Sequence, residues 1–413
     1  MKGLRKNMSI IEELYKNEKE NYEKRKEHLV NRFQATFSTK PDGIFSSCGR
    51  VELLGNHTDH NHGKALVASI DMDILAAALP TKDNCITFIS EGYDEMKVSL
   101  DDIEKVENEQ GTSTALIRGV LKGFKDRKYR AGGLKVYSTS NIWRGAGISS
   151  SAAFELLICE MLNYYYNNDK ISLVELAKIG QFAESQYFGK PCGLLDQLGV
   201  ALGGVNYIDF ANIDNPKIEN LFVNLSDYNM ILVNTGGNHS ELTSHYAQIK
   251  EDMLAVANLF NKPYLNELEY QEFSKNISNV YHKVGGRAAL RAMHFYDENA
   301  RVIKAFDALK SHNISEFLEQ VNLSGESSYK YLQNCYVPGE KEQSIPLALT
   351  LFKKVIVGGA SRIHGGGFAG TILVFVPLNQ TEVFINSMHS LYGDNSAFIV
   401  HIRNKGSVHV ETL

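Results

Sequence analysis

The segment RGAGISSSAAFE, residues 144–155, says more about the fold than any other part of this sequence. Two glycines and three consecutive serines precede an alanine-led run with the pattern of a helix. A helix that begins after such a loop presents unpaired backbone N–H groups at the positive end of its dipole. Glycines allow close approach of the backbone, and serine hydroxyls add donors or a magnesium ligand. The segment therefore predicts a phosphate site, although a plain serine-rich helix start has the same pattern. No lysine follows the last glycine, so it is not the GxxxxGK[ST] loop.

A second polar segment, CGRVELLGNHTDHNHG at residues 48–63, lies between two apolar runs. It places an arginine, three histidines and an aspartate around three glycines. Histidines in a turn are compatible with a metal site. A dense set of donors and acceptors is also what a polyhydroxylated ligand requires. The segment alone permits both interpretations.

Two further segments carry candidate chemistry. In GKPCGLLDQLGVALGG, residues 189–204, Asp196 follows Gly193 in a loop and precedes a small, apolar stretch. A carboxylate held there could orient or deprotonate an alcohol, although an isolated aspartate is more often a turn or N-cap residue. The glycines at residues 365–367, with Gly370, form a second glycine-rich turn that is by itself no more than a tight turn.

Composition excludes several classes of protein. The 413 residues are enough for two domains, and 43% hydrophobic with 22% charged residues is typical of a globular protein. A net charge of −5 argues against a nucleic-acid partner. The five cysteines form no CxxC pair, which favours a reduced, cytoplasmic protein. No apolar run reaches the roughly 18 residues of a membrane span, and the charged, helix-patterned N-terminus is not a signal peptide.

The hydrophobic pattern predicts an α+β protein. Residues 44 to about 140 have mostly strand character, and helices are expected at 150–166 and 172–188, with Ser172 as an N-cap. Strands are expected at 203–210, 229–236, 371–376 and 397–404, with a largely helical region between 241 and 334 and a helix near 381–393. The mixture indicates two domains that meet near residue 205.

Three segments, in this order and at this spacing, resemble the three motifs of the GHMP small-molecule kinases. The galactokinase branch fits best: its motifs GRVNLIGEHTDYNGG and PLGSGLSSSAALE correspond to GRVELLGNHTDHNHG and WRGAGISSSAAFE here, and ASRIHGGGFAGT resembles its third. AESQYFGKPCGLLDQ is similar to that branch's AEHxFxGxPCGIMDQ. The similarity spans roughly residues 40 to 400.

The resemblance implies a two-domain fold with the active site in the cleft between the domains. The N-terminal domain, residues 1–205, would resemble the ribosomal protein S5 domain 2-like fold. The C-terminal domain, residues 206–413, would be a ferredoxin-like-derived α+β domain. Its last strand would pack back on the N-terminal domain. The implied reaction transfers a phosphoryl group from ATP, with Mg²⁺, to the C1 hydroxyl of a hexose, galactose first. The resemblance implies neither a nucleic-acid partner nor a membrane, and the oligomeric state stays open, with a monomer as the simplest case.

The resemblance also implies roles for individual residues. Asp196 would take or orient the proton of the C1 hydroxyl, and Arg50 would keep it ionised and stabilise phosphoryl charge. Ser150 and Glu184 would be the magnesium ligands. The phosphate loop would comprise Gly145, Gly147, Ser149, Ser150, Ser151 and Ala152, and Gly365 to Gly367 would shape the site from the other domain. The sugar would contact Asn56, His57, Asp59, Gly193 and Tyr246, which leaves little room for a zinc site in the turn.

Some positions depart from the family pattern. Asn56 replaces a glutamate that contacts the O6 hydroxyl; it can still bond O6, and its lack of charge would tolerate a carboxylate at C6. We therefore expect Asn56→Glu to be tolerated if galactose is the substrate. His60 replaces a tyrosine, His62 a glycine, and Trp143 with Arg144 a Pro-Leu pair. Trp143 could belong to the core or lie near the nucleotide.

Alternatives to a galactokinase stay open at this point. They are a galacturonate kinase, another sugar 1-kinase of the family, and a non-catalytic galactokinase-like sugar sensor. The complete run Ser149-Ser150-Ser151-Ala152-Ala153, together with Arg50, Glu184 and Asp196, favours an enzyme over a sensor.

Overall fold

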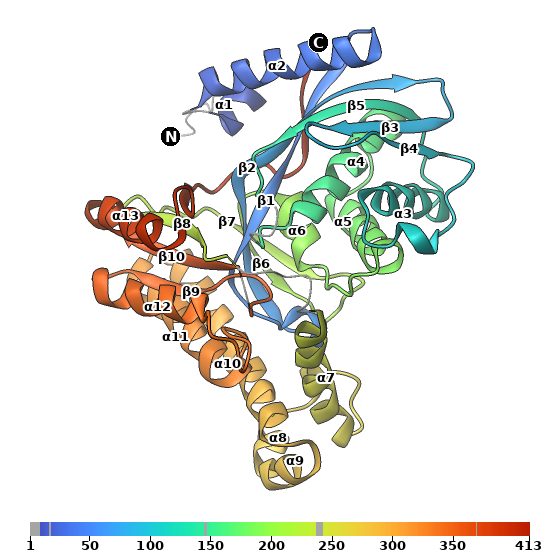
Figure 1. Cartoon of the computed structure of the whole chain (residues 1–413). Coiled ribbons are helices and arrows are strands. Elements are labelled where there is room, and N and C mark those ends of the chain that lie inside the picture. Colours follow the sequence, from blue (N-terminus) through green and yellow to red (C-terminus); the bar gives the residue numbers. More distant parts are fainter. Residues whose placement is uncertain (1–8, 16–17, 144–146, 237–242, 369) are drawn as a thin grey trace, which may run out of the picture.

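The computed structural model describes residues 9–15, 18–143, 147–236, 243–368 and 370–413. Within these ranges the strands form two sheets, and helices cover their faces, which confirms the α+β class (Figure 1). The helices are α1 Ile10–Leu14, α2 Lys19–Phe37, α3 Ser113–Asp126, α4 Ser150–Asn167, α5 Leu173–Phe182, α6 Leu195–Leu202, α7 Thr243–Leu259, α8 Tyr270–Lys275, α9 Ile277–Val284, α10 Gly286–Lys310, α11 Ile314–Ser327, α12 Ser344–Val355 and α13 Thr381–Tyr392.

The larger sheet is built on two long antiparallel strands, β1 and β2. Its strand order is β12-β1-β2-β5-β3-β4, with β6 paired to β2 and β7 to β6. All neighbours are antiparallel except β3 and β5, which are parallel. The strands are β1 Gly43–Leu54, β2 Lys64–Thr81, β3 Cys85–Ser90, β4 Met96–Ser99, β5 Gly133–Ser140, β6 Val205–Asp209, β7 Lys217–Leu221 and β12 Val408–Thr412.

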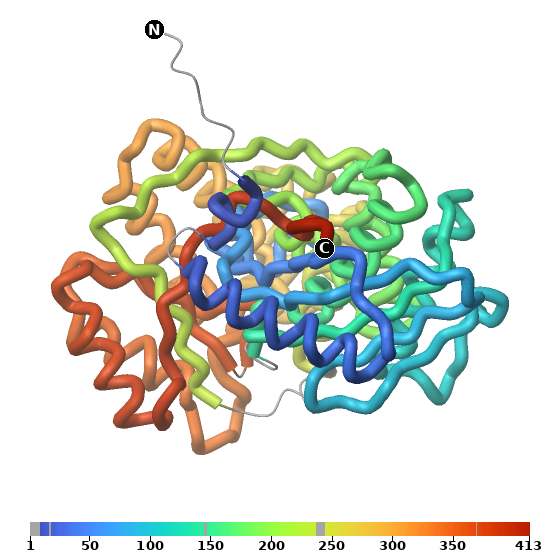
Figure 2. The backbone as a smooth tube through the Cα atoms, turned by 90° about the horizontal axis from the view of Figure 1, so that it is seen from above, coloured from blue at the N-terminus to red at the C-terminus, as the bar shows by residue number. Residues whose placement is uncertain are grey.

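Both faces of this sheet are covered, which explains why every residue of β1 is buried and why β2 contains the apolar run ILAAAL. Ile44 packs with side chains of α2, whereas its neighbour Phe45 points to the opposite face and joins the main core, to which α4 contributes. Figure 2 shows α2 lying across the sheet with the C-terminal segment beside it. The pairing of β12 with β1 brings that segment there.

The smaller sheet has the order β11-β8-β10-β9, all antiparallel. Its strands are β8 Tyr228–Asn234, β9 Ala360–Ile363, β10 Thr371–Pro377 and β11 Ala397–Val400. Because β6 and β7 extend the larger sheet, the chain changes sheet after Leu221, beyond the boundary expected at residue 205. The turn between β9 and β10 is the glycine-rich segment 364–368, and it faces the larger sheet's site residues.

Local signals were mostly sufficient for the helices. Ser172 is the N-cap of α5, as predicted, and its side chain accepts from the Glu175 amide. The expectation of mostly strand before residue 140 was wrong at α3. There Thr112 caps the helix by accepting from the Ala115 amide, a start signal that the sequence carried. Among the described residues, no helix is long and apolar enough to cross a membrane.

Candidate active site

Arg50 connects the two halves of the site. It lies on β1, is 4% exposed, and donates from Nε and Nη2 to Oδ1 of Asp196 at 2.9 and 2.6 Å. Its Nη1 donates to the carbonyl oxygen of Gly147 at 2.6 Å. Burial raises the pKa of Asp196, but the charges of Arg50 and Lys190, together with hydrogen bonds to the carboxylate, hold it below its usual range. Asp196, in the first turn of α6, is therefore ionised beside the loop that precedes α4.

The phosphate loop ends at the start of α4. Gly147 has φ +66° and Ser149 φ +61°, and no side chain caps the helix at Ser149. The amides of Ser150, Ser151 and Ala152 are the first of the helix and by position have no intrahelical acceptor. This geometry suits a phosphate group. Gly145, which was also expected in the loop, lies outside the described residues.

Glu184 is a fully buried carboxylate in the π-helical turn Ala183–Phe188. Its Oε1 accepts from Ser151 Oγ at 2.7 Å and from Lys190 Nζ at 2.9 Å, and its Oε2 accepts from Gln197 Nε2 at 2.7 Å. The hydroxyl that donates to Glu184 is therefore that of Ser151, the residue next to Ser150. The expected pairing of Ser150 with Glu184 as magnesium ligands stays a prediction.

Asp59, in the turn of residues 55–63, lies in direct contact with Gly193. A β-carbon at residue 193 would stand 1.8 Å from Asp59 Oδ2, so any side chain there would displace the Asp59 carboxylate. Burial raises the pKa of Asp59 to about 7, and the nearby charges of Asp196 and Glu52 act in the same direction. The site therefore holds two carboxylates with different protonation behaviour, one ionised on Arg50 and one that titrates near neutrality.

The histidines of the turn bond to the protein. His57 Nε2 lies 2.9 Å from the carbonyl oxygen of Gly366, so it carries the proton and donates. Its Nδ1 lies 3.3 Å from His60 Nε2, and the amide of Asn61 reaches His60 Nδ1 at 2.9 Å. Burial lowers the pKa of His57 to about 4 and that of His60 well below its usual value. Neutral rings satisfy this chain of bonds, and both nitrogens of His57, expected to contact sugar, are occupied.

Other side chains of the turn add no metal ligand. His62 stacks on Tyr264, with ring centroids 3.8 Å apart. Within the described ranges, no group of three or more His, Cys, Asp or Glu residues could hold a metal ion.

Asn56 is 1% exposed and also bonds to the protein. Its Nδ2 donates to Glu52 Oε1 at 3.2 Å and to the carbonyl oxygen of Gly365 at 2.8 Å, and its Oδ1 accepts from Asn334 Nδ2 at 2.8 Å. Arg362, fully buried, donates to the same Glu52 oxygen at 2.6 Å. In this structure the Asn56 amide is engaged between the two sheets, and its expected bond to the sugar's O6 hydroxyl stays a prediction.

The glycine-rich turn after β9 closes the site from the smaller sheet. Tyr246 Oη donates to the carbonyl oxygen of Gly367 at 2.9 Å. A β-carbon at Gly366 would come within 2.4 Å of the Tyr246 ring, and one at Gly365 within 3.5 Å of the Gly147 carbonyl oxygen. The turn therefore packs against both the tyrosine and the phosphate loop, and its glycines make that approach possible.

Several residues at the site escaped the sequence interpretation: Glu52, Lys190, Gln197, Asn334, Arg362 and His364. Lys190 was recognisable, because it directly precedes the Pro-Cys-Gly segment before Asp196. Glu52, Gln197, Arg362 and His364 lie inside the motif segments quoted above, but no spacing assigned them a role, and Asn334 lies outside those segments. Trp143 packs against Phe398 of β11, with ring centroids 4.6 Å apart, and belongs to the core.

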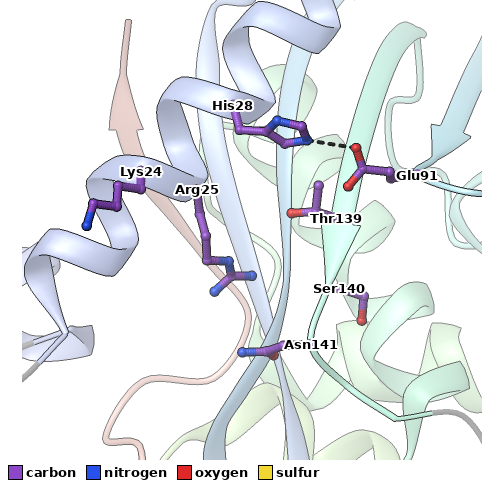
Figure 3. A pocket seen from close by; sticks show the side chains of 7 residues that line it. All are labelled: Lys24, Arg25, His28, Glu91, Thr139, Ser140 and Asn141. Atoms are coloured by element: carbon purple, nitrogen blue, oxygen red, sulfur yellow. Dashed lines mark hydrogen bonds and ion pairs between the residues drawn. The ribbon is translucent and has the colours of Figure 1, made fainter.

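A shallow pocket elsewhere does not compete with this site. Figure 3 shows it between α2 and the sheet, lined by Lys24, Arg25, His28, Glu91, Thr139, Ser140 and Asn141. Its basic side chains are each paired with a carboxylate: Lys24 with Glu20, Arg25 with Asp73 and His28 with Glu91. The pocket therefore offers a phosphate group little net charge.

Known proteins resemble this chain in both sequence and fold. A model for the galactokinase galactose-binding signature matches residues 31–80, and one for the N-terminal domain of GHMP kinases matches residues 115–204. The galactokinase of Clostridium tetani is 31% identical over 353 residues, which cover 84% of this chain and 87% of the relative. The chain belongs to the galactokinase family of GHMP kinases.

Further relatives support the same assignment. The galactokinase of Lactobacillus helveticus is 29% identical over 381 residues, covering 89% of this chain and 94% of the relative. The crystal structure of Lactococcus lactis galactokinase complexed with galactose superposes with a TM-score of 0.82 at 26% identity, covering 92% of this chain and 99% of that one. Methanococcus jannaschii mevalonate kinase, at 15% identity and a TM-score of 0.63, shares the fold; 88% of this chain and 99% of that one are covered. This is the two-domain GHMP kinase fold that the motifs implied.

Proposed function

We propose that this member of the galactokinase family transfers the terminal phosphoryl group of ATP to the C1 hydroxyl of galactose. The observation that carries the proposal is Arg50, which binds the ionised Asp196 with one edge and the phosphate loop with the other. An acceptor for a hydroxyl proton and a site for a nucleotide phosphate are thereby held at one guanidinium group.

The proposed reaction uses these groups by position and charge. The hydroxyl oxygen bonds to the terminal phosphorus as the bond from that phosphorus to the bridging oxygen of ADP breaks. Asp196 accepts a hydrogen bond from the hydroxyl and takes up its proton as the ester forms. Arg50 and the uncapped amides of α4 lie where negative charge spreads over the phosphoryl oxygens. Because phosphoryl transfer needs little nucleophile activation, orientation by Asp196 is as important as its basicity.

Mg²⁺ would be held by Ser151 and Glu184. The two side chains fit the ion, because a hydroxyl and a fully buried carboxylate meet at 2.7 Å, and oxygen ligands are those that Mg²⁺ prefers. When bound, the ion neutralises phosphate charge. Lys190, now on Glu184, adds a second positive charge to the same corner of the site.

Asp59, Gly193 and Tyr246 are the proposed sugar contacts. The carboxylate of Asp59 accepts hydrogen bonds from sugar hydroxyls, and Gly193 leaves the space that a side chain would fill. In this proposal Asn56 and His57 form the frame of the sugar pocket. The Asn56 side chain donates to the carbonyl oxygen of Gly365, and His57 Nε2 donates to that of Gly366. A wrong epimer would leave buried polar groups unpaired, which is the basis of selectivity.

Galacturonate is disfavoured by the charges at the site. Burial first, and then the charges of Asp196 and Glu52, raise the pKa of Asp59 to about 7. A third carboxylate, on the sugar, would add to this repulsion. The neutral Asn56 therefore does not signal an acidic substrate.

The experiment is an ADP-release assay with galactose, N-acetylgalactosamine, galacturonate, arabinose, glucose and mevalonate. We expect the highest kcat/KM with galactose and phosphate on C1. A higher kcat/KM with any other compound would overturn the substrate. Tight galactose binding without ADP release would instead support the sugar sensor.

A further inference from the structure

His364, which directly follows β9, has an unusual hydrogen-bonding state. It is 2% exposed, and its Nε2 accepts from the backbone amide of Glu52 at 3.2 Å. An amide can only donate, so Nε2 carries no proton. Burial, with the charges of Arg50 and Arg362, lowers the pKa of His364 well below its usual value. The ring is neutral, and its one proton lies on Nδ1.

The Nδ1–H group has no acceptor. It is buried and makes no hydrogen bond within the described ranges. A buried donor without a partner is destabilising, and such groups are rare in native proteins. A donor of this kind beside an active site points to a partner that arrives with the substrate.

The position of Nδ1 identifies that partner. A β-carbon placed on Gly147 would lie 3.6 Å from Nδ1, which is the nearest atom to that position. The carbonyl of Gly147 accepts from Arg50, whose other edge binds Asp196. The donor thus borders the end of the phosphate loop nearest to the carboxylate that receives the sugar hydroxyl. The phosphate that must reach this end is the terminal one.

We propose that His364 is a further catalytic residue, which donates from Nδ1–H to an oxygen of the terminal phosphoryl group of bound ATP. This inference rests on the proposed kinase activity, although not on the identity of the sugar. A neutral donor stabilises charge on the phosphoryl oxygens without competing with Arg50 for Asp196. Gly147 places no side chain between the donor and the loop.

Two substitutions separate the two nitrogens of His364. Asparagine can place a donor near the position of Nδ1 but cannot reach the Glu52 amide. Glutamine can place an acceptor near the position of Nε2 but has no donor near Nδ1. We expect His364→Gln to keep Tm close to wild type while kcat falls tenfold to about a hundredfold. We expect His364→Asn to lower Tm and to retain more of kcat than His364→Gln.

Nucleotide binding supplies a readout that a structural role would not move. Titration calorimetry without sugar compares the affinities for ADP and for a non-hydrolysable ATP analogue. The difference between them measures how much the terminal phosphoryl group contributes to binding. His364→Gln should weaken binding of the analogue about tenfold or more and leave ADP binding unchanged. Equal losses for both nucleotides, or a kcat within twofold of wild type, would overturn the proposal. If wild type binds both nucleotides but phosphorylates no sugar, the proposed function fails while this titration still tests His364.

Discussion

Asn56→Glu tests whether Asn56 is a frame residue or a sugar contact. In the structure its Nδ2 donates to Glu52 Oε1 at 3.2 Å and to the Gly365 carbonyl oxygen at 2.8 Å. Glutamate would replace this double donor by a carboxylate that faces a second carboxylate and a carbonyl. The sequence alone indicated a tolerated change; the contacts indicate the opposite.

The cost can be estimated in two ways. Two unit charges at 3 to 4 Å repel by roughly 5 kcal/mol at an effective dielectric constant near 20. The new glutamate can avoid this by keeping its proton, which at pH 7 costs about 4 kcal/mol relative to a pKa near 4.3. The lower of these two energies sets the limit, so we expect the free energy of unfolding to fall by about 4 kcal/mol. At about 2.1 cal/mol/K per residue over 413 residues, Tm falls by about 5 °C if the chain unfolds as one unit.

Calorimetric Tm measurements from pH 5 to pH 8 provide the assay. The new glutamate has a raised pKa in the folded state, so the unfolded state releases its proton first. The difference in Tm from wild type should therefore grow as pH rises above about 4.3 and shrink in acid. Asn56→Gln, which has the same length and no charge, is the matched control and should show no such pH dependence.

A second variant tests the partner. Glu52→Gln combined with Asn56→Glu restores one amide and one carboxylate in contact, so the double variant should be more stable than the sum of the single effects implies. A Tm of Asn56→Glu within 1 °C of wild type at every pH, with unchanged kcat/KM, would refute the frame role.

Three further changes test other parts of the site. Asp196→Asn should lower turnover by a factor on the order of 10² or more, and Arg50→Ala should do the same with a less than additive double variant; near wild-type ADP release by Asp196→Asn would make it a mere turn residue. Folding raises the pKa of Asp59 from 3.8 to about 7, so its ionisation destabilises the folded protein as pH rises through that window. Asp59→Asn should therefore raise Tm at pH 8 and leave it unchanged below about pH 4. The same variant should weaken galactose binding. A Tm gain that is equal at both pH values would contradict this assignment. Gly193→Ala places a β-carbon 1.8 Å from Asp59 Oδ2 and should raise KM for galactose at least tenfold. Gly286→Ala, where the nearest atom outside its own helix is 3.5 Å away, is its control and should leave KM unchanged; equal KM values for the two variants would mean that the turn yields freely.

Local sequence signals were enough to predict the α+β class and to name Arg50 and Asp196 as site residues. Capping residues, glycine positions and apolar periodicity are local properties of the sequence. Ser172 therefore predicted the start of α5, and the serine run predicted the start of α4. Arg50 and Asp196 could be named because each lies in a segment with a recognisable family motif.

The tertiary structure alone decided which polar groups are available to a ligand. A side chain has a fixed number of donors and acceptors, and partners far away in the sequence occupy them. The amide of Asn56 is taken by Gly365 and Asn334, and His57 by Gly366, more than 270 residues away in each case. Among the described residues, Nδ1 of His364 has no partner for the same reason, because packing places the Glu52 amide on one side of the ring and Gly147 on the other.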